Sequence, residues 1–287
     1  MRAESAFGAP IIRFVETAST MDEARKLAAS GTPPGTLVLA DHQSQGRGRT
    51  RGRSWLGEKG ESLLATLVAP EDWKSLPALT LRIGLALAAA CEDFARARGV
   101  RLAIELKWPN DLMARERKLG GILCESGPEG LLAGFGINIA QDSFPGPLAD
   151  TATSLALLAA PKLLMEESAR ISALDDFAAA DREEAGKEGA IALRDSLARL
   201  CLARLAAIGA EGDWKGEIEA RLWRRGRLAR ISTGLPDGGP SIEARILGLA
   251  DDGALLAEGL EGSALSFHSA ELGIAASVDP GRSDQLS

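Results

Sequence analysis

The sequence predicts an α+β fold: a mixed or antiparallel sheet flanked by helices, with a small β-barrel after it. Three apolar runs of strand length follow one another at residues 101–108, 118–126 and 131–140, which is typical of an antiparallel meander. A long apolar helical pattern over residues 79–99 precedes them and ends at a glycine. Beyond Gly226, short strands separated by glycine-containing turns indicate the barrel.

The composition is that of an ordinary globular protein. Hydrophobic residues make up 45% and charged residues 25% of the 287 residues, and this length allows one large domain or a main domain with an appendage. The formal net charge of −7 argues against general binding to DNA or an anionic membrane, because the field of the whole surface would repel a polyanion. We expect a cytoplasmic protein, since the first residues lack the apolar core of a signal peptide and no long apolar run is present.

The first predicted elements surround a basic loop. Thr20 precedes Glu23 by three residues, which is the spacing of a capping box, so a short helix is predicted to begin there. Residues 36–41 and 62–70 are apolar runs with a high β-propensity. The loop between these two runs is therefore predicted to join two strands.

The second half of the chain is predicted to change from helices to strands. Residues 163–225 carry Ala, Leu, Arg and Glu at helical spacing, and we expect a mobile break at the acidic, glycine-containing segment 181–189. The predicted organisation is a main domain over residues 1–225, a barrel domain over residues 226–276 and a disordered tail over residues 277–287.

The basic loop reads QGRGRTRGR over residues 45–53. In an extended chain its arginines share one face and repel one another, so the folded loop needs an anion or carboxylates nearby. The glycines between them let main-chain N–H groups turn inward and complement the guanidinium forks around a phosphate. A solvated basic loop is the alternative, but Trp55 follows and offers an aromatic face that can close over a ligand. We predict a phosphate-bearing ligand here; the arginines are Arg47, Arg49, Arg51 and Arg53.

Lys107 ends a predicted strand, on the face opposite an apolar row that includes Ile104 and Leu106. A lysine at a strand end can simply reach water. Trp108 and Pro109 stiffen the position, however, and the arginine loop could make Lys107 one cation of an anion site that stabilises a developing oxyanion.

Glycines interrupt the next two predicted strands. Gly120 and Gly121 lie in KLGGILCE, and GFGIN ends at the polar residue Asn138. Glycines inside an apolar strand mark a close approach, either by a ligand or by neighbouring strands of a tightly packed sheet. The sequence leaves both readings open.

Several common chemistries are excluded or weakened. His42 and His268 are the only histidines, so a histidine-rich metal site is excluded. The cysteines lack zinc-site spacing, and their odd number suits reduced, buried thiols. No P-loop, no G-x-S-x-G elbow and no G-x-G-x-x-G opening a helix occurs. The chemistry must use cations and positioning; the cysteines are Cys91, Cys124 and Cys201.

Several segments, in this order, resemble those of biotin protein ligases. ETASTMDEA resembles the family's biotin-contact segment, QSQGRGRTRGRSW its adenylate-binding loop and LKWPND its catalytic-lysine motif. KLGGIL and GFGIN are similar to the strands that follow, and the segments GALLAE and SFHSAEL to the family's small C-terminal domain. The resemblance covers most of the chain and implies the family's mixed-sheet catalytic fold with a small C-terminal SH3-like β-barrel.

The resemblance also implies roles for individual residues. Catalytic roles are implied for Lys107, which would stabilise the carboxylate and the α-phosphate, and for Arg49. The implied biotin contacts are Ser19, Thr20, Gln43, Arg47, Gly48, Arg49 and Lys107, of which Ser19 and Thr20 would bond the ring. The implied nucleotide contacts are Arg51, Arg53 and Trp55.

The implied reaction has two steps. Biotin and ATP, with Mg²⁺, would form biotinyl-5'-adenylate and release pyrophosphate, and a lysine of a biotin carboxyl carrier protein would then attack the adenylate. The arginine loop would fold over the adenylate and exclude water. A lipoate or octanoate ligase, and a non-catalytic module that binds anionic ligands, are the alternatives.

The sequence departs from the family pattern in three ways. Met21 stands where the family often has asparagine, and the arginine loop is one residue longer than the common form. The ligase motifs begin within the first 20 residues, so the helix-turn-helix repressor domain of some members is not expected, nor is regulation through DNA.

Overall fold

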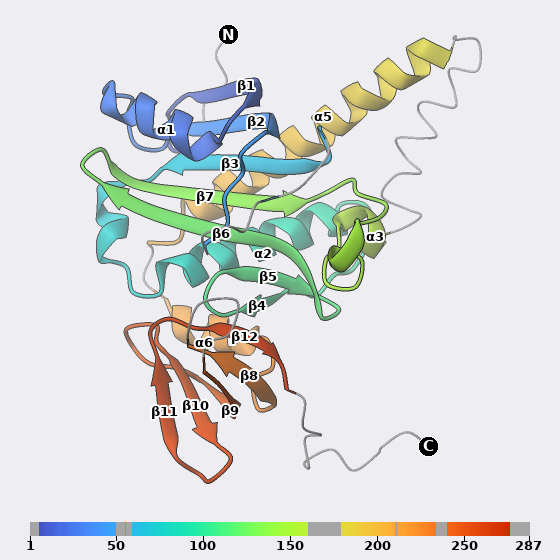
Figure 1. Cartoon of the computed structure of the whole chain (residues 1–287). Coiled ribbons are helices and arrows are strands. Elements are labelled where there is room, and N and C mark those ends of the chain that lie inside the picture. The colour runs from blue at the N-terminus through green and yellow to red at the C-terminus, as the bar shows by residue number, and fades with distance from the viewer. Residues whose placement is uncertain are drawn as a thin grey trace.

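The computed structural model describes residues 6–49, 55, 59–159, 179–209, 212–233 and 240–275. Within these ranges the main sheet has seven strands in the order β1-β2-β3-β7-β6-β5-β4 (Figure 1). β1 pairs with β2 in parallel and the other neighbours pair antiparallel, so the predicted mixed sheet is confirmed. The strands are β1 (Ile11–Thr17), β2 (Leu37–Gln43), β3 (Ser62–Val68), β4 (Glu105–Lys107), β5 (Asp111–Ala114), β6 (Arg117–Gly127) and β7 (Gly130–Asn138).

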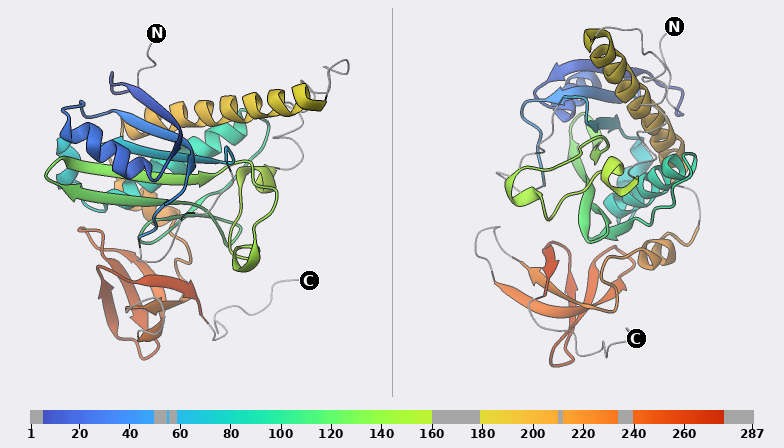
Figure 2. Two further views of the ribbon diagram at one scale, coloured as in Figure 1. Left: turned by 45° about the horizontal axis from the view of Figure 1, so that its top comes forward. Right: turned by 90° about the vertical axis from the view of Figure 1, so that its right-hand side faces the viewer.

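Helices cover both faces of this sheet (Figure 2). Successive side chains of a strand point to opposite faces, and β2 shows the division. Leu37 and Leu39 pack in the large core with α2 and α5, whereas Val38 packs in a smaller cluster with Met21 and Ala24 of α1. The helices are α1 (Thr20–Ala29), α2 (Leu79–Arg96), α3 (Leu155–Ala159), α5 (Ala179–Leu205) and α6 (Trp214–Ala220), with short 3₁₀ turns at η1 (Glu71–Ser75) and η2 (Gly146–Leu148).

A second sheet lies below the edge of the first that β4 and β5 form (Figure 1). In the described part of the chain it has five antiparallel strands in the order β11-β10-β9-β8-β12, which is consistent with the predicted SH3-like barrel. The Nε1–H group of Trp108 donates a hydrogen bond to the carbonyl oxygen of Gly253 at 3.1 Å, which ties the two sheets together. The strands are β8 (Leu228–Ser232), β9 (Ser241–Leu249), β10 (Leu255–Gly259), β11 (Ala264–Phe267) and β12 (Glu271–Ile274).

The capping-box prediction at the start of α1 is wrong, although the helix does begin at Thr20. Ser19 is the N-cap residue, and no side chain caps the helix. Glu23 instead accepts a hydrogen bond from the hydroxyl of Thr17 at 3.1 Å. The hydroxyl of Thr20 is occupied by partners on β2 and β3, so tertiary contacts replace the local cap.

Two further boundaries differ from the predictions. Strand β4 covers only Glu105–Lys107 of the predicted 101–108, and β5 (Asp111–Ala114) lies in a segment expected to be a connection, because the chain turns back at Pro109 and pairs immediately. The break predicted at residues 181–189 is wrong, because α5 passes through this segment as one helix. The tail predicted as disordered, residues 277–287, lies outside the described residues.

A buried ion pair joins α2 to the chain that leads into the second sheet. The guanidinium group of Arg221 donates to both carboxylate oxygens of Glu92, at 2.6 and 3.0 Å, and the main-chain N–H of Ile104 donates to the same carboxylate at 3.0 Å. The side chain of Glu92 is 10% exposed. The hydrogen bond that Arg221 donates to Glu92 raises the pKa of Arg221, against the opposing effect of burial.

We expect Arg221→Ala to lower the free energy of unfolding by about 2 kcal/mol, because it leaves the Glu92 carboxylate buried without its cation. This loss is smaller than that of a fully buried ion pair, since the side chain of Arg221 is partly exposed to water. Urea unfolding measures this value. Lys215→Ala, which breaks the exposed pair with Asp251, is the control and should leave the unfolding midpoint unchanged. Equal losses in the two variants would contradict the assignment.

Candidate functional site

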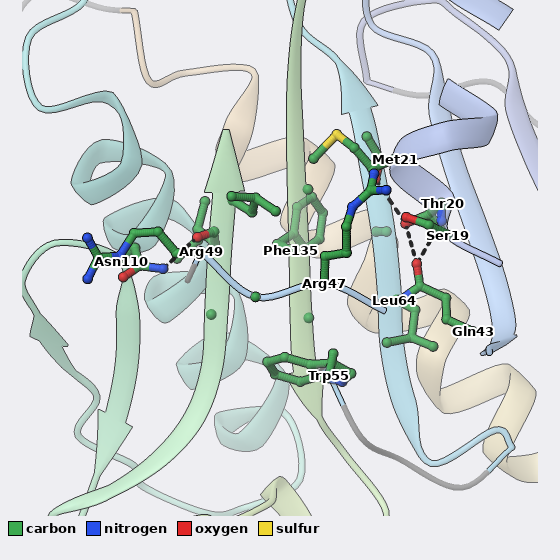
Figure 3. A pocket seen from close by; sticks show the side chains of 18 of the residues that line it. Ser19, Thr20, Met21, Gln43, Arg47, Arg49, Trp55, Leu64, Asn110 and Phe135 are labelled. Carbon is green, nitrogen blue, oxygen red and sulfur yellow. Dashed lines mark hydrogen bonds between the residues drawn. The ribbon is translucent and has the colours of Figure 1, made fainter. Parts of the chain in front are cut away.

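The arginine loop closes at its base over the main sheet. The main-chain N–H of Trp55 donates to the carbonyl oxygen of Gly46 at 3.0 Å, so the two ends of the loop meet. The indole ring of Trp55 lies against β7 at Gly136, where a Cβ atom would lie 2.7 Å from the ring (Figure 3). Only glycine leaves room for the ring at this position.

Arg47 is anchored on α1 by a bidentate ion pair. Its guanidinium group donates to the two carboxylate oxygens of Asp22 at 2.7 and 3.1 Å, and Arg25 also donates to Asp22 at 2.9 Å. The hydrogen bond from Arg47 is the largest cause that holds the pKa of Asp22 below its ordinary value. The same bond raises the pKa of Arg47. One acidic side chain thus fixes the cation at the mouth of the site.

Arg49 reaches from the loop to the second sheet. Its Nη2 atom donates to the carbonyl oxygen of Ala270 at 3.0 Å, and lies 3.8 Å from a carboxylate oxygen of Glu271 on β12. Arg47 and Arg49 therefore leave the loop toward different parts of the molecule, which reduces the repulsion expected between them. The loop contacts both the main sheet and the second sheet.

A group of polar side chains lies at the start of α1. The side-chain oxygen of Gln43 accepts hydrogen bonds from the main-chain N–H of Thr20 at 2.7 Å and from its hydroxyl at 3.0 Å. The Thr20 and Thr66 hydroxyl oxygens lie 2.9 Å apart. Ser19 and Thr20 are both buried. Three elements, α1, β2 and β3, are thus joined by hydrogen bonds at one point (Figure 3).

These groups surround a first cavity of about 80 Å³. It brings together Ser19, Thr20, Gln43, Arg47, Gly48, Arg49 and Trp55, all of which the sequence singled out. Lys107 is not among its described lining residues, and Arg51 and Arg53 lie outside the described residues. The cavity therefore has a polar end at α1 and a cationic end at the loop.

A second cavity, of about 900 Å³, lies between the main sheet and β12. Lys107 lines it, with its ammonium group 5.0 Å from the centre of the Trp223 ring. Apolar groups of the segment around η2 and of the second sheet form other parts of its wall, among them Phe144, Leu148 and Leu272. Of the described residues, five line both cavities: Gly48, Arg49, Trp55, Asn110 and Lys118.

Lys118 is a site cation that the sequence reasoning missed. Its ammonium group lies 2.6 Å from a carboxylate oxygen of Asp111. A Cβ atom at Gly121 would lie 3.2 Å from the same ammonium group, so this glycine makes room for the lysine. Its sequence signal is weak, a lysine two positions before the glycine pair, and does not by itself place the side chain at a cavity. Glycine is required at position 120 for a different reason. A Cβ atom there would lie 2.8 Å from the carbonyl oxygen of Gly136, so Gly120 allows β6 and β7 to pair closely.

Three common functional features are absent from the described part of the chain. No three His, Cys, Asp or Glu side chains gather there in a group that could hold a metal ion. The three thiols are not reactive candidates in their present form: burial raises the pKa of Cys91 and of Cys124 to about 12, and raises that of Cys201 well above its ordinary value. None of the helices described is both long and apolar enough to cross a membrane.

Comparison with protein families and curated proteins gives consistent matches. Residues 12–142 match the Biotin/lipoate A/B protein ligase family. A biotin--[acetyl-CoA-carboxylase] ligase of Mycobacterium tuberculosis is 34% identical over 54% of this chain and 62% of its own length. The bifunctional ligase/repressor BirA of Bacillus subtilis is 37% identical over 50% of this chain and 46% of its own. The chain thus spans about half to three fifths of the length of these curated relatives.

Solved structures resemble the whole fold. A mutant form of the biotin protein ligase from Aquifex aeolicus, in complex with biotin, has a TM-score of 0.68 and 25% identity, and the match covers 92% of this chain and 98% of that one. The Aquifex aeolicus enzyme in complex with biotin and ATP has a TM-score of 0.64 and 25% identity, over 91% and 97% of the two chains. Both sheets of the present chain therefore have counterparts in solved structures.

We expect the pKa of Asp22 to rise more in Arg47→Ala than in Arg25→Ala, because the hydrogen bond from Arg47 is the largest cause that lowers it. Since the folded pKa lies below 3.8, the contact stabilises the closed loop fully above pH 3.8 and is lost as the pH falls through the folded pKa. Titration of the carboxyl carbon of Asp22 by NMR measures both variants. A larger rise in Arg25→Ala would overturn the assignment.

Proposed function

We propose that this chain, whose residues 12–142 match the Biotin/lipoate A/B protein ligase family, joins biotin to a lysine of a biotin carboxyl carrier protein in an ATP-dependent reaction of two steps. The observation that carries the proposal is the junction of the two cavities, where two cations and a tryptophan line both. An acid in the first cavity and a nucleotide in the second would meet there. The names of the curated relatives, and the biotin and ATP complexes of the Aquifex aeolicus enzyme, support the same choice of substrates.

In this proposal biotin occupies the first cavity. Its ring lies at the polar end, against the buried residues Ser19 and Thr20 and the partly buried Gln43, whose oxygen and nitrogen atoms bond its polar edge. Its carboxylate points toward the loop, where Arg47 and the main chain of Gly48 enclose it. The polar and cationic ends of the cavity give the acid one orientation.

ATP occupies the second cavity with its α-phosphate at the junction. Arg49 and Lys118 stabilise the charge that develops as the biotin carboxylate attacks the α-phosphorus and pyrophosphate leaves. Lys107, which faces only the larger cavity, holds the nucleotide together with Trp55. Arg51 and Arg53, which lie outside the described residues, are assigned to the nucleotide by the resemblance in sequence alone. Mg²⁺ would accompany the phosphates of ATP and help to neutralise their charge.

In the second step the amine of the carrier lysine attacks the carbonyl carbon of biotinyl-5'-adenylate, which is a mixed anhydride of biotin and AMP. An amide forms and AMP leaves. The closed loop keeps water from the anhydride until the carrier arrives. The partner is a carrier domain of a biotin-dependent carboxylase, and we place the reaction in the cytoplasm. We assign the ligase chemistry to residues 1–225, with residues 226–276 as a barrel domain that supports the loop through Arg49.

The central test is intact-mass analysis of an apo biotin carrier domain after incubation with the protein, ATP, Mg²⁺ and biotin, with lipoic acid in a parallel reaction. We expect a gain of one biotinyl group on the carrier, dependent on ATP. A lipoyl gain instead would assign the lipoate branch of the family, and no gain with either acid, with no pyrophosphate released, would leave only a binding module.

The two lysines should differ in their kinetic effects. Lys118→Ala should lower kcat for pyrophosphate release by about 10²–10³-fold, since it removes a charge that stabilises the transition state. Lys107→Ala should raise the KM for ATP and leave the KM for biotin unchanged, because Lys107 lines only the larger cavity. Lys74→Ala, on the 3₁₀ turn η1, is the matched control and should leave both constants unchanged.

One outcome would exchange the roles of Lys107 and Lys118. If Lys107→Ala alone removes the first step at saturating ATP, while Lys118→Ala keeps it, Lys107 is the cation at the reacting centre, as the resemblance in sequence implies.

A further inference from the structure

Met21 forms an apolar wall at the otherwise polar end of the first cavity. It is the second residue of α1, is 4% exposed, and packs with Ala24, Val38 and Leu132. It also lines the cavity, beside Ser19 and Thr20 (Figure 3). A molecule at this end would therefore meet hydrogen-bonding groups on one side and a thioether on the other.

The position of Met21 depends on a glycine of β7. A Cβ atom at Gly134 would lie 2.7 Å from the terminal methyl carbon of Met21, which is closer than such contacts occur. The next nearest atoms, the carbonyl oxygen of Leu123 at 3.4 Å and the hydroxyl oxygen of Thr66 at 3.5 Å, are at ordinary contact distance. The methyl group of Met21 thus occupies the space that the missing side chain of Gly134 leaves.

Methionine suits a wall that must adapt to a ligand. Its side chain is unbranched, has three rotatable bonds and carries a polarizable sulfur, so it fills irregular space without a fixed shape. The cavity is small, about 80 Å³, while its polar groups on α1 and β2 are held by mutual hydrogen bonds. Met21 therefore gives these fixed polar groups an apolar neighbour that can adapt its shape.

We propose that Met21, seated against Gly134, is the residue that sets which acid the pocket accepts. This inference rests on the proposed function and names a specificity-determining residue for it. The ring of the acid lies with its polar edge toward Thr20 and Gln43 and its apolar edge against the thioether of Met21. An acid whose ring has both edges, such as biotin, is favoured over one whose ring is wholly apolar, such as lipoate.

Binding of biotin and of lipoate, measured by calorimetry, tests the wall directly. Met21→Ala should weaken biotin binding by about tenfold and reduce the preference for biotin over lipoate, since the two fused rings of biotin cover more of the thioether than the single small ring of lipoate and lose more contact. Met21→Leu keeps most of the apolar volume and should leave the preference within about threefold of the parent value. An unchanged preference in Met21→Ala would overturn the inference.

A double-mutant comparison tests the pairing with Gly134. Gly134→Ala should weaken biotin binding by about tenfold or more, because the added methyl group drives Met21 into the cavity. Adding Met21→Ala should cause no further loss, so the double variant should bind biotin about as weakly as Met21→Ala alone, because the methyl group that meets the new Cβ atom is gone. Losses that multiply in the double variant would contradict the pairing.

The measurements distinguish a failure of the proposed ligase function from a failure of the proposed role of Met21. If the parent protein binds biotin but releases no pyrophosphate with ATP, the ligase function fails, and Met21 is still judged by the binding measurements. If the parent is an active ligase and Met21→Ala leaves the acid preference unchanged, the function stands and the role of Met21 is excluded. Should Gly134→Ala fail to fold, the comparison of Met21→Ala with Met21→Leu decides alone.

Discussion

The missing side chains at two alternate positions of β7 are the constraint on which the site depends. Gly134 and Gly136 lie two residues apart on one strand, so the places that their side chains would take face the same side of the sheet. Met21 lies over the first and the ring of Trp55 over the second, each at a distance that any Cβ would prevent. Because these two positions of a central strand carry no side chains, α1 and the arginine loop approach the sheet closely enough to enclose a cavity.

Charge is managed locally in a chain whose total charge is negative. Arg47 is held by Asp22 on α1, Arg49 by a main-chain oxygen next to β12, and Lys118 by Asp111 on β5. Each cation therefore has a partner on a different element, and the cations gather around one cavity without sharing a partner. An incoming anion would meet positive groups whose positions are already fixed, which is the arrangement that electrostatic stabilisation requires.

Much of the fold could be predicted from sequence, because apolar runs report burial directly. The meander, the long helix α2 and the second sheet follow from such runs. Strand β5 could not be found this way, since it is short and follows Pro109 almost at once. The capping box failed because the Thr20 hydroxyl bonds Gln43, a residue distant in sequence. The acidic segment of α5 was expected to interrupt a helix that in fact continues, so local composition was the weaker guide.

The residues of the site also divide into those that the sequence made visible and those that it did not. The arginine loop and Trp55 were visible because repeated charge and glycine in a loop have few structural uses. Lys118 was not, because strand alternation alone does not say which side chains border a cavity. Its position follows from a register shift between Leu112 and Met113, which places the start of β6 beside β5 with its lysine toward Asp111. Such an irregularity arises from pairing across the sheet and has no local signature.

The contact between Arg49 and the second sheet is made to a main-chain oxygen, and this has a consequence for how the protein can vary. A carbonyl group is present whatever residue occupies position 270, so exchanges of that side chain leave the acceptor in place. The contact is sensitive instead to length. Deleting one residue between β11 and β12 would replace this carbonyl with its neighbour, which in an extended chain points the opposite way. The second sheet is thus free to diverge in sequence at this point while the spacing of its last connection is held constant.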